Sequence, residues 1–478
     1  MSKFVSSSIW NFVANFIVRV MSVVTFPFLV RFFLKEDISL FKSFQSFVLI
    51  LLTIIPLGTN ILYLSAPQEM REKRWNLFFY FSLGVSIVLS LALLLNDTVS
   101  SFFIKHHVSG QVKGLLILFP LVEGIKVLAV TKLSSIIDFK GISIALILKQ
   151  LFLYAGIIIF AFFTPTLTVL LSLVFYSEIL ELLLLLIHTK KQKITLLPVK
   201  DYPALMFDRT AKKFILFSGI EQTILTFAMQ FPTIFVVMVM GETLSPEFQL
   251  PFSAVALPVS LVMNSVARVS FPHYSNLRDD EKIINSLFAL LFPVTLVLFP
   301  TLLGIHFFAK EITVIFFDKT WQNAIFALQA FPILMFTYIL GVPSTFISNI
   351  KQKPQINLIY SIALFISRIL SIHFGYKLAG FPGVIVLFIA GDILVRFVRL
   401  KVDIGLLSLS LRRFLSSIKY NIYSSLIMLV LMWGSYYLFQ SKILSFVIAS
   451  LVALPLNYYW ERERINGTIS VLWQAVWK

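Results

Sequence analysis

The chain has 478 residues, of which 58% are hydrophobic and only 13% are charged, and its formal net charge is +17. Soluble domains carry about 25% charged residues, so this composition excludes a soluble globular protein and predicts a polytopic membrane protein. The sequence has no cysteine, which excludes disulfides, iron–sulfur clusters and thiolate zinc sites. The basic residues are spread over many short segments. That spread argues against nucleic-acid binding and suits contact with anionic membrane lipids.

Apolar segments in chain order predict fourteen transmembrane helices, because helices satisfy every backbone hydrogen bond within lipid. The first segment is too long for a signal peptide and has no small-residue cleavage site, so it is expected to remain as a helix. An even number of helices places both termini on the same side. The expected spans are residues 8–34, 42–66, 76–95, 111–136, 143–163, 166–187, 213–239, 249–272, 284–308, 323–347, 356–375, 381–400, 417–439 and 442–460.

The distribution of lysine and arginine predicts the orientation. Most of these residues lie in the termini and in the loops that follow even-numbered helices. The opposite loops hold few of them, and Lys35 and Lys42 are assigned to the first of these loops. The positive-inside rule then places both termini in the cytoplasm.

Proline spacing indicates that two halves of six helices arose by duplication. Pro27 and Pro67 are 40 residues apart, as are Pro232 and Pro272, and a shift of 205 relates the two pairs. A parallel repeat has its pseudo-twofold axis along the membrane normal and its substrate site between the halves. The expected fold is all-α, with two six-helix lobes and two extra C-terminal helices. Its divisions are residues 1–190, a cytoplasmic linker at 191–212, residues 213–402, and residues 403–478 with the extra helices and a cytoplasmic tail.

Ionisable residues inside the apolar segments are the strongest functional signal. A charge at the bilayer centre costs on the order of 2.5–3.5 kcal/mol on insertion scales, so it usually faces the bundle interior or a watery cavity. The ionisable residues inside the apolar segments are Arg19, Glu123, Lys126, Lys149, Glu178, Glu181, Glu221, Arg268, Arg368 and Asp392. Several of them are cationic, which favours an anionic ligand.

Polar side chains form one-sided stripes on the helices that duplication would place at the centre. Four-residue spacing puts Asn15 on the face of Arg19, and Asn264 on the face of Arg268. Amide and hydroxyl groups of this kind can also bond across packed helices, at about 0.6 kcal/mol each. Arg268 could instead extend toward the headgroups. The candidate substrate-binding residues are Arg19, Asn15, Asn60, Gln222, Asn264 and Arg268.

The remaining interior charges are open to a structural and a functional interpretation. Spacing of three or four residues predicts local ion pairs. These pairs are Glu123–Lys126 and Asp392–Arg396. Glu178 and Glu181 share one helix face, and Lys149 or Arg368 from a neighbouring helix could neutralise them. Alternatively, Glu221, Glu178 or Glu181 could take up H⁺ or Na⁺ and couple transport to an ion gradient.

The sequence predicts no catalytic residue, no metal site and no organic cofactor. It contains neither the G-x-x-x-x-G-K-[ST] motif of nucleotide-binding loops nor the H-E-x-x-H motif of metalloproteases. The predicted outer loops are short, whereas membrane glycosyltransferases usually work through large ones. A transporter is therefore expected rather than an enzyme.

Five short segments carry loose motifs in a fixed order. They are Trp10–Phe12, Phe33–Phe41, Phe271–Lys282, Ala309–Ile312 and Phe316–Ala324. Together they resemble bacterial polysaccharide transporters of the MOP superfamily, the Wzx type of lipid-linked oligosaccharide flippase, over about residues 1–402. The chain departs from the family at Asp318, which stands where a Gly-x-x-Trp-x-x-Ala pattern usually has its glycine.

The resemblance implies a MATE/MOP-like pair of lobes around a cationic cavity. It implies flipping of undecaprenyl-diphosphate-linked oligosaccharide (an O-antigen, capsule or exopolysaccharide repeat unit) from the inner to the outer leaflet of the bacterial cytoplasmic (inner) membrane by alternating access. Related flippases have a helix-1 arginine at the position of Arg19, and diphosphates suit arginine and amide donors. A polymerase and glycosyltransferases of the same pathway are the implied partners. The alternatives are a lipid II flippase, a multidrug or cation antiporter and, in a different class, a membrane glycosyltransferase or O-antigen ligase.

Overall fold

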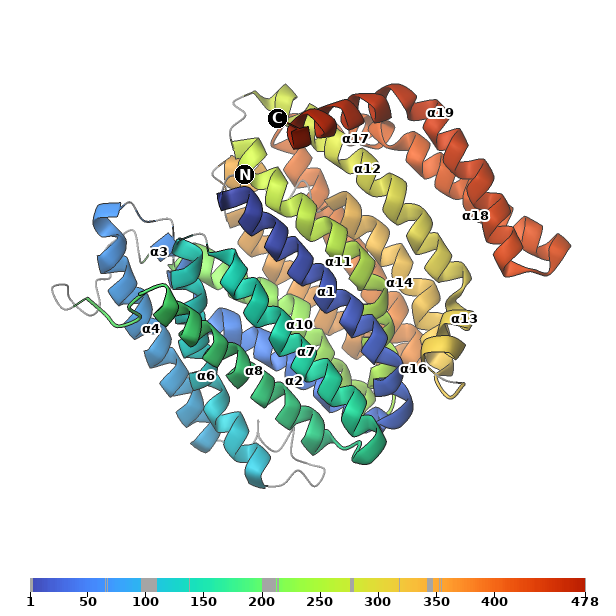
Figure 1. The fold of residues 1–478 in the computed structure, drawn as a ribbon. Coiled ribbons are helices and arrows are strands. Elements are labelled where there is room, and N and C mark those ends of the chain that lie inside the picture. Colours follow the sequence, from blue (N-terminus) through green and yellow to red (C-terminus); the bar gives the residue numbers. More distant parts are fainter. Residues whose placement is uncertain are drawn as a thin grey trace. The chain divides into compact units, whose positions relative to one another are not determined.

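The computed structural model describes residues 3–64, 66, 68–95, 110–136, 138–199, 212, 215–275, 279–317, 319–341, 347–351, 353 and 355–477. These residues form helices and connecting turns, and no strand occurs among them (Figure 1). Thirteen of the described helices are long and apolar enough to cross a membrane. The predicted all-α polytopic fold is therefore confirmed.

Packing divides the chain into two compact units. The first comprises Met1–Gln249 with Ser361–Ile369, and the second comprises Leu250–Tyr360 with Leu370–Lys478. The predicted division into residues 1–190, 191–212, 213–402 and 403–478 stays a prediction.

The first unit is built from long helices that pack side by side. α1 packs on α7, α7 on α8, α6 on both α4 and α8, and α10 on α2. Its elements are α1 (Lys3–Phe32), α2 (Lys35–Ile54), α3 (Thr59–Leu64), α4 (Gln68–Leu95), α6 (Gly110–Ser135), α7 (Phe139–Phe163), α8 (Leu167–Lys191), the π-helical turn η1 (Ile215–Gly219), α10 (Ile220–Met240) and the beginning of α11 (Ser245–Ser275).

In the second unit, α12 packs against α14 and α18, and α18 packs along α19. Met428, Met432, Ala449 and Ala453 are buried at the contact between the last two helices. Besides the rest of α11, the elements are α12 (Asp280–Phe307), α13 (Ala309–Ile312), the π-helical turn η2 (Thr313–Phe317), α14 (Gln322–Gly341), α15 (Ile347–Ile350), α16 (Gln355–Gly405), α17 (Leu411–Ser417), α18 (Lys419–Phe439) and α19 (Lys442–Trp477).

The 51-residue α16 contains two of the fourteen predicted helices. Its helical geometry breaks at Ala379 (φ −148°, ψ 24°) and Gly380 (φ 60°, ψ −141°). The backbones of Gly375 and Gly383 then approach so closely that a Cβ on Gly375 would lie 2.6 Å from the Gly383 carbonyl oxygen. Only glycine tolerates this bend without strain. The two predicted spans 356–375 and 381–400 correspond to the two legs of α16.

The second predicted span, residues 42–66, is wrong in two respects. It begins too late, and it predicts one continuous helix where the structure has two, α2 and α3. α2 begins at Lys35, with Glu36 and Asp37 in its first turn, where carboxylates favour a helix N-terminus. The assignment of Lys42 to a loop is thus also wrong, because Lys42 lies two turns inside α2. Leu57 (φ 39°) ends the helix with a turn before α3 begins.

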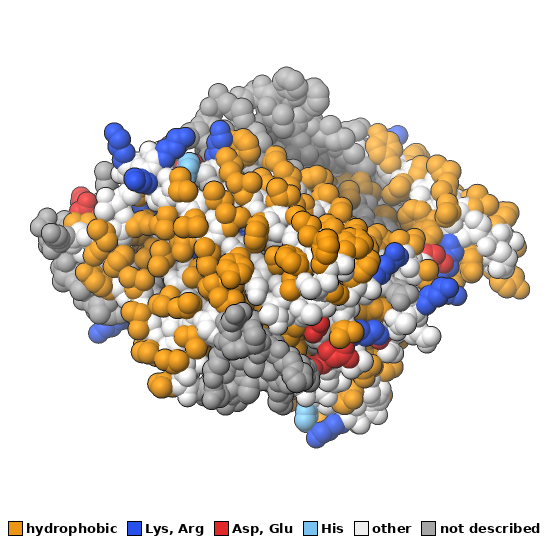
Figure 2. Space-filling view, turned by 60° about the horizontal axis from the view of Figure 1, so that its bottom comes forward, with side chains coloured by type: hydrophobic (Ala, Val, Ile, Leu, Met, Phe, Trp, Pro, Cys, Tyr) orange, Lys and Arg blue, Asp and Glu red, His pale blue; other side chains and the backbone are white. Residues whose placement is uncertain are grey.

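Apolar side chains cover much of the described surface that faces the viewer in Figure 2, and lysine and arginine side chains stand in small groups. Large apolar residues on several helices are well exposed, for example Val88, Ile187 and Val430 at 65%, 65% and 69%. Apolar exposure on this scale marks a surface made for lipid contact. The protein is a multi-pass membrane protein.

Candidate functional site

Two cations lie inside the first two helices. Half-buried Arg19 on α1 lies within electrostatic range of Lys42 on α2 and of Tyr154 on α7. Lys42 Nζ donates to Gln45 Oε1 at 3.2 Å, and the Tyr154 side chain is hydrogen-bonded with Ser22. Two positive charges beside amide, phenol and hydroxyl groups suit an anion with several oxygen acceptors. We refer to Arg19 and Lys42 as the cation pair.

The other predicted substrate-binding residues are only partly placed by the structure. Asn15 is half-buried one turn from Arg19 on α1, while Asn60 and Gln222 are half-buried on α3 and α10. Their convergence on one site stays a prediction, as does an ion-coupling role for half-buried Glu221 on α10. The side chains of two further candidates on α11 lie outside the described residues. These are Asn264 and Arg268.

Lys42 is the member of the site that the sequence reasoning missed. Its polar neighbourhood, from Lys35 to Ser46, resembles a loop when only hydropathy is read. The available signal was the acidic pair Glu36–Asp37, which is typical of a helix first turn. Starting the helix there would have put Lys42 within the membrane segment, where a lysine needs a functional or structural reason.

A second set of charges forms a buried cluster between α6, α7 and α8. We call it the Lys–Glu cluster, and it consists of Glu123, Lys126, Lys149, Glu178 and Glu181. Lys126 Nζ lies 2.7 Å from Glu123 Oε1, contacts Glu178 Oε2, and lies 3.3 Å from Glu181 Oε2. Lys149 Nζ lies 2.6 Å from Glu178 Oε1 and 2.9 Å from Glu181 Oε2. The predicted Glu123–Lys126 pair is confirmed, and Lys149 neutralises the two glutamates of α8 together with Lys126.

Arg368 does not take that role, since it lies against α10. The residue is 2% exposed, and its guanidinium donates from Nη1 to the Ala228 carbonyl oxygen at 2.8 Å. In a regular helix this carbonyl would accept from the residue four positions on, but that residue is Pro232, which has no N–H. Arg368 therefore supplies the donor that the proline removes from α10.

In the second unit, the predicted Asp392–Arg396 pair is confirmed, with Arg396 Nη2 3.1 Å from Asp392 Oδ2. Arg396 Nη1 also donates to the Tyr360 hydroxyl at 3.2 Å. One turn further on, Arg399 Nε pairs with Asp403 Oδ2 at 2.7 Å. The two ion pairs lie within one leg of α16 and have the character of structural pairs, and the bond to Tyr360 ties that leg to the beginning of the other.

The start of α2 is held against the start of α11 by a row of polar contacts. We call this the α2–α11 clasp, and it consists of Lys35, Glu36 and Ser39 with Thr243, Ser245 and Glu247. Lys35 Nζ lies 2.6 Å from Glu247 Oε1, the Ser39 and Ser245 hydroxyls are 2.5 Å apart, and Thr243 Oγ1 donates to Glu36 Oε1 at 3.0 Å.

The sequence separations across the clasp are 212, 206 and 207 residues. They are close to the 205-residue shift that relates the proline pairs of the two predicted halves. At a twofold axis each position meets its own counterpart. Two duplicated halves that touch at their axis are therefore expected to make contacts between residues separated by about the length of the repeat. The separations across the clasp fit this expectation and support the predicted parallel repeat.

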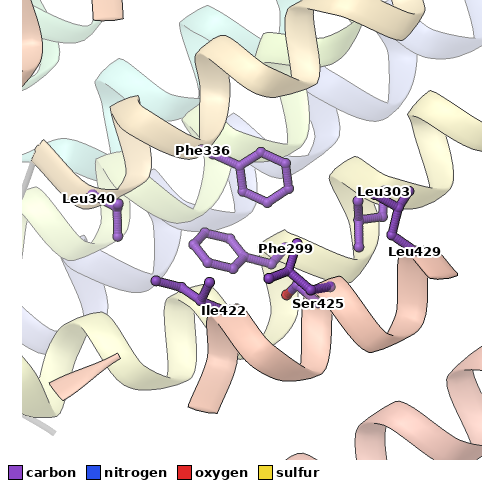
Figure 3. A pocket seen from close by; sticks show the side chains of 8 residues that line it. Phe299, Leu303, Phe336, Leu340, Ile422, Ser425 and Leu429 are labelled. Atoms are coloured by element: carbon purple, nitrogen blue, oxygen red, sulfur yellow. The ribbon is translucent and has the colours of Figure 1, made fainter. Parts of the chain in front are cut away.

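A cavity of about 310 Å³ lies between α12, α14 and α18 in the second unit (Figure 3). It is lined by Phe299, Leu303, Phe336, Leu340, Ile422, Ser425, Leu426 and Leu429. The single polar lining group, the Ser425 hydroxyl, donates to the Asn421 carbonyl oxygen at 2.6 Å. This cavity offers nothing to a charged headgroup.

Long apolar helices with a small set of buried charges define a polytopic helical membrane protein. A family model described as "Polysaccharide biosynthesis protein" matches residues 28–326. The chain belongs to this family. Lipopolysaccharide biosynthesis protein WzxC of Escherichia coli (strain K12) is 25% identical over 207 residues, which are 42% of this chain and 42% of that protein. The match thus spans less than half of the relative's length.

Solved structures show the same fold at low sequence identity. An inward-facing multidrug resistance MATE family transporter of the MOP superfamily aligns with a TM-score of 0.62 at 15% identity, covering 84% of this chain and 94% of that one. A MOP superfamily transporter from Pyrococcus furiosus aligns with a TM-score of 0.55 at 14% identity, covering 85% of this chain and 94% of that one. The predicted MATE/MOP-like fold is confirmed.

Proposed function

We propose that the protein is a flippase that moves an undecaprenyl-diphosphate-linked oligosaccharide from the inner to the outer leaflet of the bacterial cytoplasmic membrane. The family relates the chain to polysaccharide biosynthesis, and the MOP fold to transport. The cation pair is the observation that supports an anionic lipid-linked substrate, because two interior cations require a compensating anion or water.

The chemistry of the cation pair suits a diphosphate. The planar guanidinium of Arg19 can hold two phosphate oxygens at once, and Lys42 adds a compact positive charge. Away from bulk water these charge-assisted hydrogen bonds are stronger than neutral ones. We infer that Asn15, Asn60 and Gln222 meet phosphate or sugar oxygens. Substrate contacts of Asn264 and Arg268 stay a prediction from the sequence.

Alternating access gives the α2–α11 clasp a role in the cycle. With both termini in the cytoplasm, α1 ends and α2 begins on the outer side of the membrane, so the clasp closes that side. Release of the glycan into the outer leaflet then requires the clasp to separate. The clasp is polar and small, which suits a contact that must break and re-form in each turnover.

Replacement of the cation pair tests this function. Arg19→Ala and Lys42→Ala should abolish surface polysaccharide in a host that lacks its own flippase, while lipid-linked oligosaccharide accumulates in the inner leaflet. Arg31→Ala is the matched control, because Arg31 is an exposed arginine at the end of the same helix. Normal surface polysaccharide in correctly inserted Arg19→Ala protein would refute the assignment.

Two further experiments separate the proposal from its rivals. Rescue of a strain depleted of its lipid II flippase would identify a peptidoglycan precursor as the substrate. Transfer of sugar between lipids by the purified protein in detergent would establish a glycosyltransferase or ligase, since flipping requires two leaflets and transfer does not.

A further inference from the structure

The Lys–Glu cluster is unbalanced by one charge. Three carboxylates (Glu123, Glu178 and Glu181) meet two ammonium groups, those of Lys126 and Lys149. With all five groups ionised the cluster carries a net charge of −1. All of them are at most 9% exposed, so water does little to stabilise the excess charge. A buried site of this kind tends to take up the ion that restores neutrality.

The oxygens of the cluster are not equally occupied. Both oxygens of Glu178 are in contact with ammonium groups, and Glu181 Oε2 lies near both lysines. Glu123 is fully buried, and its Oε1 accepts from Lys126, while its Oε2 has no hydrogen-bond partner within the part of the chain that the structure describes. An ionised carboxylate with a bare buried oxygen is costly, whereas a protonated one is not.

Among the described residues, the cations that act on Glu123 are Lys126 and Lys149, and the uncharged neighbours on its α4 side include a hydroxyl group. α4 turns Ser82, Ser86 and Ser90 inward, and all three are buried. Ser86 Oγ lies against the backbone of Gly124, the residue next to Glu123. A Cβ on Gly124 would lie 2.2 Å from this oxygen. The Ser82 and Ser90 hydroxyl oxygens are also buried without a partner in the described chain. α4 therefore contributes an uncharged hydroxyl beside Gly124, and this group leaves the charge count of the cluster unchanged.

The other neighbours of α6 are accounted for in the same way. α8 contributes the two glutamates and α7 contributes Lys149, all within the cluster. α2 meets α6 through the rings of Phe44 and Phe119, whose centroids are 5.4 Å apart. α3 meets it through the Tyr63 hydroxyl, 3.3 Å from Ser135 Oγ.

A proton fits this site better than a metal cation. Hard cations such as Na⁺ or Ca²⁺ require several oxygen ligands at once. Here the ammonium groups already occupy the carboxylate oxygens of Glu178, and Glu123 offers one bare oxygen. No group of three or more His, Cys, Asp or Glu residues in the described chain is arranged to hold a metal ion.

We propose that Glu123 is a proton-binding site, that its bound proton makes the Lys–Glu cluster neutral, and that release of this proton is coupled to the transport cycle. The bound form is the neutral carboxylic acid, and release returns the carboxylate and one proton to solvent. Only the coupling rests on the proposed function, since the protonation stands on the charge count and the unpartnered oxygen. The proposal thus assigns ion coupling to Glu123 on α6 rather than to Glu178 and Glu181 on α8, and the role of Glu221 on α10 stays a prediction.

Infrared spectroscopy of the purified full-length protein in lipid nanodiscs tests the protonation directly. The wild type should show the carbonyl stretch of a buried protonated carboxyl group, which shifts in heavy water. Glu123→Gln should lose this band, and Glu123→Asp should keep it at a changed frequency. Glu311→Gln is the control, because Glu311 is an exposed glutamate paired with Lys442, and it should leave the band unchanged.

Thermal unfolding provides a second readout. A proton bound only in the folded state is lost as the pH rises, so the melting temperature of the wild type should fall toward alkaline pH. Glu123→Gln has two carboxylates and two ammonium groups, so it should fold and should lose this part of the pH dependence. A band that persists in Glu123→Gln would overturn the proposal. The proposal would also be overturned if Na⁺ at fixed pH raised the melting temperature of the wild type and removed its infrared band.

Transport in vesicles separates this proposal from the proposed function. An imposed proton gradient should accelerate flipping of lipid-linked oligosaccharide by the wild type and should have no effect on Glu123→Gln. Gradient-driven flipping that continues unchanged in Glu123→Gln would refute the coupling and leave the flippase assignment intact. A wild type that shows the infrared band but flips no glycan would refute the flippase assignment and leave the protonation intact.

Discussion

The α2–α11 clasp should open when its ion pair is removed. Glu247 is 4% exposed at its side chain and Lys35 is 20% exposed, with 2.6 Å between Nζ and Oε1. At an effective dielectric constant of about 20, two unit charges at this distance attract by about 6 kcal/mol. Desolvation offsets much of this, and breaking a buried pair typically costs about 3–5 kcal/mol. Because Lys35 is partly exposed, we expect Lys35→Ala to destabilise the clasped state by about 2–3 kcal/mol.

A shift of that size raises the open population roughly 30- to 150-fold. The sequence has no cysteine, so Ser245→Cys introduces a unique thiol at a position that is 0% exposed while the clasp is closed. Its rate of modification by a maleimide should rise by the same factor when Lys35→Ala is added. Arg31→Ala, which removes an exposed cation from the last turn of α1, should leave the rate unchanged. Equal rates in the presence and absence of Lys35 would refute the reasoning.

Two further predictions concern single contacts. Ser39→Cys with Ser245→Cys should form a disulfide under oxidation, since the two hydroxyl oxygens are 2.5 Å apart, and should stop glycan export until a reductant is added; export that continues while the bond is intact would contradict a gating role. Arg368→Met leaves the Ala228 carbonyl oxygen without its donor and should cost about 1–3 kcal/mol in thermal unfolding. Pro232→Ala restores a backbone N–H, so it should reduce that loss in the double variant; losses that simply add would show that Arg368 acts otherwise.

The helices and the local ion pairs could be predicted from the sequence because both depend on neighbours along the chain. Apolar runs mark the spans, and the three-residue spacing of Glu123 and Lys126 fixes their pairing on one helix face. The sequence offered Lys149 or Arg368 as the cation near Glu178, whereas the structure pairs Glu178 with Lys149 and also with Lys126. Choosing between them requires knowing which helices are adjacent, and helix spacing does not contain that information.

Sequence patterns fail to predict a helix that begins with polar residues, and they fail to predict a contact in which one residue replaces a donor that another lacks. Because α2 begins with polar residues, its first two turns are not predicted as helix, and Lys42 is not predicted to lie near Arg19. The role of Arg368 depends on Pro232, and nothing in the spacing of two residues on separate helices reveals that one completes the other. The sequence shows both Arg368 and Pro232, but the contact of Arg368 with α10 forms only in the tertiary structure.

The bond between Arg368 and the Ala228 carbonyl also has a consequence for biosynthesis. The two residues are separated by 140 positions, so at about 5–20 residues per second the donor is made on the order of 10 s after the acceptor. Until then α10 has an unsatisfied carbonyl, which is costly in hydrocarbon. A growing chain therefore contains a defect until its α16 is made, and a chain truncated before α16 keeps that defect. Such a defect gives membrane quality control a way to distinguish truncated chains from finished ones.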